Sequence, residues 1–179
     1  MKFSHLIFGL MIGVGACSAG TTEAYFTTRQ TAETFGPTTE VFTITYHFGA
    51  TDREFLLPIT ALRDTLDTTN KQLGFSIVDG SNKPTTLGTT TALVLSHAAI
   101  RDGRYVVPAG TSTDFTLVTV WTRPAGTSAL PYRMLVTSLP FTMNVRGTAY
   151  ENHLNPSELQ YYITPPLHHI TVSYTLKQK

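Results

Sequence analysis

The sequence predicts an all-β fold, an antiparallel β-sandwich with at most one short helix. Apolar and polar residues alternate over residues 41–48 and 169–176, which is typical of strands with one buried face. Thr, a β-branched residue that favours strands, accounts for 32 of the 179 residues. Turn-forming sequences separate the strand-like stretches at roughly 8–12-residue spacing, as in sandwiches and barrels.

The same alternation places the strands in chain order. Within 41–48 every second residue from Phe42 to Phe48 is apolar, and Thr, His and Val occupy the alternate positions. Turn signals such as Phe35-Gly36-Pro37 stand between strands. The expected strands are 24–31, 41–48, 54–60, 73–78, 91–96, 105–107, 114–123, 132–138, 161–164 and 169–176.

Helix is expected at one place at most. Ile59, Leu62 and Leu66 have helical spacing, which favours a short helix over 59–67, although the Thr and Asp residues there favour a loop. Residues 155–158, Asn-Pro-Ser-Glu, have the N-cap, the proline and the acidic residue of a helix start, with room for one or two turns. Residues 145–160 are the longest stretch without strand character, so we expect a strand crossover or a functional loop there.

The first 19 residues have the pattern of a secretory signal. Met1-Lys2 supplies a positive charge, residues 6–14 form an apolar run, and small residues follow up to Ala19. The run is shorter than the roughly 20 apolar residues that span a bilayer. We therefore expect a signal peptide over 1–19 and a single β-sandwich domain over 20–179. The protein would be exported, to the medium, the cell surface or the periplasm.

Cys17 is the single cysteine and ends the sequence VGAC at 14–17, which resembles the lipobox of bacterial lipoproteins. The resemblance implies that Cys17 carries a lipid and becomes the mature N-terminus. The alternative is an ordinary signal peptide cut after Ala19 or Ala24, which would discard Cys17. In either case the mature domain forms no intramolecular disulfide and depends on its core for stability.

Residues 105–111, YVVPAGT, form a turn that leads into the strand expected at 114–123. This motif resembles the late hairpins of exported immunoglobulin-like sandwiches on bacterial surfaces. The resemblance implies an immunoglobulin-like form of the β-sandwich and a place at the cell surface. The paired cysteines around a Trp that characterise antibody domains are absent from the sequence.

The charge balance excludes some partners. The chain has 13 Lys and Arg against 12 Asp and Glu, and no run of like charges. Nucleic-acid binders usually carry a basic patch, and electrostatic membrane binding needs clustered Lys or Arg. We therefore expect no nucleic-acid partner, and contact with a membrane only through a lipid on Cys17.

Catalytic and metal-binding motifs are weak in this sequence. His47 and His169, each on the Thr-bearing face of an expected strand, are the candidates for a metal site, but no third ligand is identifiable. A Gly-x-Ser-x-Gly motif is absent and the acidic residues are scattered rather than paired. We expect no enzyme, cofactor or metal, with a loop-based hydrolase or metal site around His47, His169 and Asp52 as an alternative.

Aromatic residues are the better candidates for binding a partner. Tyr161 and Tyr162 are adjacent, so on a strand they point to opposite faces and one is expected to be exposed, as is Tyr150. Exposed aromatics anchor protein partners or stack on sugars. Trp121 shares a face with Phe115 and is expected in the core.

Three functions follow from these observations. The first is a non-enzymatic module of the cell surface or envelope that binds a protein or glycan or has a structural role. The second is a pilin-like, self-associating subunit in which residues 21–39 pair with a neighbour by strand addition. The third is the loop-based enzyme or metal site. An exposed aromatic or apolar patch favours the first function.

Overall fold

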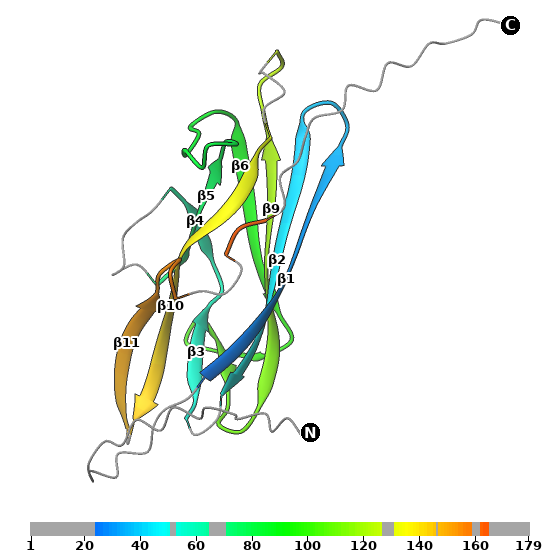
Figure 1. Cartoon of the computed structure of the whole chain (residues 1–179). Coiled ribbons are helices and arrows are strands. Elements are labelled where there is room, and N and C mark those ends of the chain that lie inside the picture. Colours follow the sequence, from blue (N-terminus) through cyan, green and yellow to red (C-terminus); the bar gives the residue numbers. More distant parts are fainter. Residues whose placement is uncertain are drawn as a thin grey trace, which may run out of the picture.

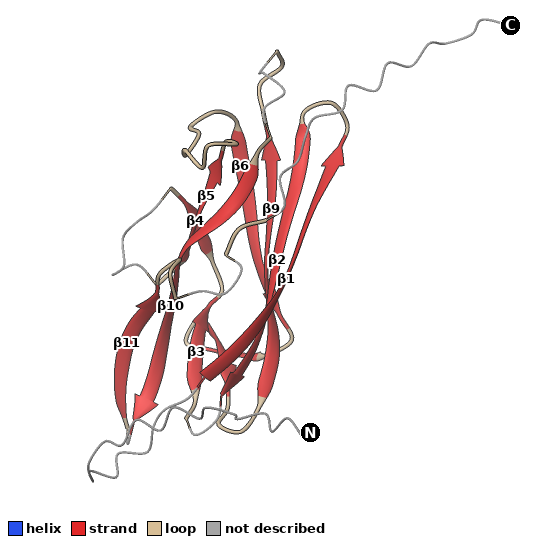
Figure 2. Ribbon diagram, viewed as in Figure 1, coloured by secondary structure: helices blue, strands red, loops and turns tan. Residues whose placement is uncertain are grey.

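The computed structural model describes residues 24–50, 53–64, 71–126, 131–145, 147–158 and 162–164. Over these residues the chain forms two β-sheets packed face to face, with no helix (Figure 1; Figure 2). The predicted all-β sandwich is therefore confirmed. In particular, this part of the chain has no helix of the length and apolarity needed to cross a membrane. The signal-like residues and Cys17 lie outside the described residues.

The first sheet has four antiparallel strands in the order β1-β2-β9-β6. β1 and β2 pair over all twelve residues of each strand, and the turn between them contains Gly36 at a φ of 69°, which suits glycine. β1 and β6 are the two edges of this sheet. The bounds are β1 Ala24–Phe35, β2 Thr39–Ala50, β6 Thr89–Ser96 and β9 Ser112–Thr122.

The second sheet has seven strands in the order β4-β5-β10-β3-β8-β7, with β11 also paired to β10. β4 and β5 run parallel, and every other pair in this sheet is antiparallel. β10 connects two parts of the sheet, because its first half pairs with β5 and its second half with β3 and β11. The bounds are β3 Phe55–Pro58, β4 Ala61–Arg63, β5 Leu73–Val78, β7 Ala99–Arg101, β8 Arg104–Val107, β10 Arg133–Val145 and β11 Thr148–Leu154.

The core lies between the sheets and follows the predicted alternation. In β2, Phe42, Ile44, Tyr46 and Phe48 are at most 2% exposed. Trp121 of β9 is fully buried, as predicted. The second sheet supplies the other side of the core, and all six residues of β5 are buried. Alternation therefore identified the inward face of β2 correctly, and the strand expected at 169–176 lies outside the described residues.

The predictions for residues 54–67 are wrong in part. The strand expected at 54–60 ends at Pro58, whose missing N–H cannot continue a ladder, and the chain starts again as β4. β4 takes the place of a helix over 59–67, of which residues 65–67 lie outside the described residues. The Thr60 carbonyl accepts a hydrogen bond from the Leu73 N–H at 2.9 Å, so the backbone is held as a strand on β5.

The prediction that residues 145–160 lack strand character is also wrong. β11 pairs with β10 over seven residue positions, although its sequence shows no alternation, because five of its residues are exposed. The helix start expected at 155–158 forms a single turn. The Glu158 carboxylate accepts a hydrogen bond from the Asn155 N–H at 2.8 Å, as in half of a capping box.

The YVVPAGT segment is not part of a hairpin. β8 belongs to the second sheet and β9 to the first, so residues 108–111 cross between the sheets. Two hydrogen bonds fix the crossing, from the Gly110 N–H to the Ala50 carbonyl and from the Ala50 N–H to the Thr111 carbonyl, each at 2.9 Å. The turn therefore ties the two sheets together at one end of the sandwich.

Candidate functional site

The tyrosines expected to bind a partner have different surroundings. Tyr150, on β11, is 52% exposed, as predicted. Tyr162 is half-buried against the core, and its carbonyl accepts a hydrogen bond from the Val136 N–H at 2.8 Å. Tyr161 lies outside the described residues, as do Cys17 and His169. The structure therefore places one of the three tyrosines, Tyr150, openly on the surface.

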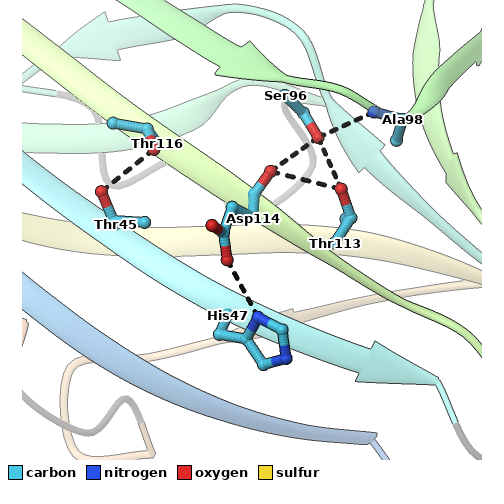
Figure 3. A network of polar contacts seen from close by, with 7 residues as sticks. All are labelled: Thr45, His47, Ser96, Ala98, Thr113, Asp114 and Thr116. Carbon is cyan, nitrogen blue, oxygen red and sulfur yellow. Dashed lines mark hydrogen bonds and ion pairs between the residues drawn. The ribbon is translucent and has the colours of Figure 1, made fainter.

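His47 has an acidic partner that the sequence did not reveal. Its Nδ1 lies 2.9 Å from Asp114 Oδ1, across the β2–β9 ladder (Figure 3). The two side chains are 44% and 63% exposed, so water screens this pair and it contributes little to stability. Asp52, the acid expected near His47, lies outside the described residues. Only the strand register brings His47 and Asp114 together.

Ser96 lies near this pair but bonds elsewhere. Its hydroxyl donates to the Asp114 carbonyl at 2.7 Å, accepts from the Ala98 N–H at 3.1 Å and lies 3.0 Å from the Thr113 hydroxyl (Figure 3). These bonds hold the chain where it leaves β6. Ser96 thus stabilises a turn rather than extending the His47–Asp114 pair into a catalytic triad. Across the described residues, no three His, Cys, Asp or Glu side chains cluster as metal ligands would.

The outer face of the four-stranded sheet carries nine uncharged side chains on three adjacent strands. We call them the Thr/Val/Leu face. In strand register they form three rows, with β2, β9 and β6 each contributing one residue to every row. The rows are Val41, Val120 and Thr91; Thr43, Val118 and Leu93; and Thr45, Thr116 and Leu95.

This face is uncharged and is most exposed at β6. Leu93 and Leu95 are 55% and 50% exposed, while the Thr and Val residues of β2 and β9 are partly exposed. Each residue occupies about 4.8 by 6.8 Å of one sheet face, so the nine cover about 300 Å². The surface is mixed, because four of the nine side chains are Thr, and its apolar part is smaller than the roughly 300–600 Å² of the largest apolar patches on monomeric proteins. The Thr45 and Thr116 hydroxyls form a hydrogen bond to each other at 3.0 Å, so both hydroxyls of this row have a hydrogen-bond partner within it.

A cleft of about 390 Å³ lies on the second sheet. Leu56, Arg104, Thr142 and Glu151 line it, and the strand register puts these residues on the face opposite the core residues Phe55 and Leu57. The cleft is thus on the outer side of the sheet. Its complete lining is Leu56, Pro58, Lys71, Arg104, Pro140, Phe141, Thr142, Glu151, Asn152 and His153.

The charged groups of the cleft converge on one carboxylate. Glu151 Oε1 lies 2.8 Å from Lys71 Nζ and 3.3 Å from Arg104 Nη2. Hydrogen bonds from Lys71 and then Arg104 lower the pKa of Glu151. Arg104 also donates to the hydroxyl of Thr142, a residue only 3% exposed. Two cations therefore share one carboxylate, and the lining has a surplus of one positive charge.

Sequence reasoning missed both surfaces. Arg104 and Thr142 are far apart in the chain, and β11, which supplies Glu151, lies in the stretch expected to lack strands. The alternation over 41–48 did identify the polar face of β2. The sequence, however, contains no information about which strands lie beside it.

No protein-family model and no curated protein matches the sequence. Among solved structures, the chain is similar to the crystal structure of the GAE domain of yeast GGA1, with 5% sequence identity and a TM-score of 0.30. The similarity covers 72% of this chain and 88% of that chain. A similarity of this size supports no conclusion about function.

Proposed function

We propose that the protein is an exported, non-enzymatic β-sandwich module of the cell surface or envelope that binds a partner. The observation that supports this function is the Thr/Val/Leu face, nine uncharged side chains with two half-exposed leucines, bordered in register by Glu33 and by the His47–Asp114 pair. Such a surface favours a protein partner with an uncharged patch at its centre, because a charge buried against these nine side chains would lose hydration without gaining an ion pair. A glycan partner is the other candidate for this face.

The binding role is tested by photocrosslinking in the native host. A photoreactive amino acid replaces Leu95 in the exported chain, and a matched variant carries it at Tyr150, which has the same exposure on the other sheet. We expect a discrete adduct through position 95 and none through position 150. Absence of an adduct at 95 would contradict the proposal. An adduct at 150 alone would move the partner site to β11.

Export and the lipid anchor are tested by the intact mass of the mature protein from membrane and medium fractions. A chain beginning at Cys17 with an added diacylglyceryl group supports an anchored lipoprotein. A bare chain beginning at Gly20 or Tyr25 in the medium removes the anchor and supports a secreted module. An uncleaved chain in the cytoplasm contradicts export altogether.

A fibre-forming subunit is the second candidate, and the edges of the four-stranded sheet favour it. β1 and β6 lie at opposite edges, and neither has a second strand partner among the described residues. Pairing of β1 in one copy with β6 in the next would extend the sheet without limit. Sedimenting polymers at high concentration would support this role, and a strictly monomeric species would contradict it.

A further inference from the structure

The cleft on the second sheet lies on the opposite side of the sandwich from the Thr/Val/Leu face and plays no part in the function proposed above. We propose that it binds one carboxylate-bearing sugar unit, a hexuronate, of an acidic polysaccharide. Three features carry the proposal: a surplus positive charge, an apolar floor, and an imidazole, His153, that can bond to hydroxyls.

The cations are held where a carboxylate can reach them. Arg104 has a side chain only 13% exposed and is fixed by the buried Thr142 hydroxyl, so its guanidinium is oriented before any ligand arrives. Lys71 is 63% exposed and follows the ligand more freely. Arg104 uses one N–H donor on Thr142 and one on Glu151, out of the five of its guanidinium. A ligand carboxylate would gain charge-assisted hydrogen bonds from both cations and neutralise the lining.

The neutral lining is suited to a sugar ring. Leu56 and Pro140 offer apolar surface to the C–H face of a ring, while His153, in register with Pro140, has ring nitrogens that can bond to hydroxyls. Sugar hydroxyls need partners of both kinds. A volume of about 390 Å³ is at the lower end for small-molecule sites, which suits one or two rings.

An acidic peptide suits the cleft less well. A run of Asp or Glu brings several negative charges, and the lining offers one surplus positive charge and its own carboxylate, Glu151. A second acidic side chain would therefore meet Glu151 without a cation to offset it. One uronate ring seated in the cleft brings one charge, which matches the surplus of the lining, and the carboxylates of the adjoining rings lie outside the cleft.

The proposal is tested by titrating trigalacturonate into the full exported chain and following binding by calorimetry. Its methyl-esterified form, equal in shape and uncharged, serves as the ligand control. We expect the acid to bind and the ester to bind at least about tenfold more weakly. Arg104→Gln should lower the affinity for the acid by about tenfold, and Lys83→Gln, at an exposed lysine outside the cleft lining, should leave it unchanged.

Glu151→Gln should change the affinity for trigalacturonate in the opposite direction to Arg104→Gln. Without its carboxylate, Lys71 and Arg104 are released to the ligand, and we expect the affinity to rise several-fold. Absence of binding to the folded wild type, equal affinity for acid and ester, or weaker binding by the Glu151→Gln variant would each overturn the proposal. Tighter binding of hexaglutamate than of trigalacturonate would replace the sugar with an acidic peptide. None of these results depends on the crosslinking partner of Leu95.

Discussion

Glu40 is the buried acid from which the sharpest prediction follows. It lies in β2 on the core side, and its residue is 1% exposed. Its Oε1 is 3.9 Å from Arg123 Nε, too far for a hydrogen bond, and its Oε2 has no hydrogen-bond partner among the described residues. Burial raises the pKa of Glu40 from 4.5 to about 7, and Arg123 opposes this only in part.

The raised pKa fixes the direction of the pH dependence. The folded state binds this proton more tightly than the unfolded state, so the contribution of Glu40 to stability is full below about pH 4.5 and is lost as the pH rises through 7. Each pH unit between the two pKa values is worth about 1.4 kcal/mol, so the loss totals about 3 kcal/mol. Glu40→Gln mimics the protonated acid. We therefore expect the variant to match the wild type at pH 4 and to exceed it by about 3 kcal/mol at pH 9.

Urea denaturation followed by Trp121 fluorescence measures this difference, because Trp121 is the single tryptophan, is fully buried and is the strand partner of Glu40. Glu33→Gln on the neighbouring strand is the matched control, since Glu33 is exposed, and we expect it to change stability by less than about 0.5 kcal/mol at either pH. If the wild type instead gained stability relative to Glu40→Gln as the pH rose, attraction to Arg123 would outweigh desolvation and the reasoning would be refuted.

Three further substitutions test local contacts within the sandwich. Gly88→Ala should lower the free energy of unfolding, measured by urea denaturation, by about 3 kcal/mol or more. Gly88 has a φ of 74°, and an added Cβ would overlap the Thr122 carbonyl oxygen. A loss below about 1 kcal/mol would contradict this reasoning. Tyr105→Phe should lower the free energy of unfolding by about 1–2 kcal/mol in the same assay, because the Val94 carbonyl loses the hydroxyl that donates to it at 3.0 Å. An unchanged midpoint of urea unfolding would show that water replaces this hydrogen bond. His47→Ala should change stability by less than about 1 kcal/mol, since its ion pair is exposed, and a larger loss would indicate a role beyond that pair.

The sequence was sufficient to predict which side chains point inward where one face of a strand is buried. The alternation over 41–48 predicted the inward side chains of β2, because a half-buried strand imposes a period of two on its residues. Trp121 was assigned to the core by the same argument. Turn residues such as Gly36 marked strand ends correctly, because positive φ restricts the choice of residue.

The sequence was insufficient where pairing rather than burial determines structure. β11 has no periodic pattern, and its backbone bonds to β10 make it a strand. Neither surface proposed here could be predicted, because each needs the order of strands within a sheet. The register that aligns Thr43, Val118 and Leu93 joins three distant segments. Arg104 and Glu151 meet for the same reason.

The two halves of β10 have different consequences for local stability. The first half is packed in the core beside β5, whereas the second half supports β11, most of which is exposed. A register shift between Val136 and Ser138 separates them. Amides of the first half should exchange with deuterium only through global unfolding. Amides of β11 should exchange through a sub-global opening of lower free energy. The cleft thus includes the weaker unit, β11, and an occupant would slow exchange in β11 while leaving the first half of β10 unchanged.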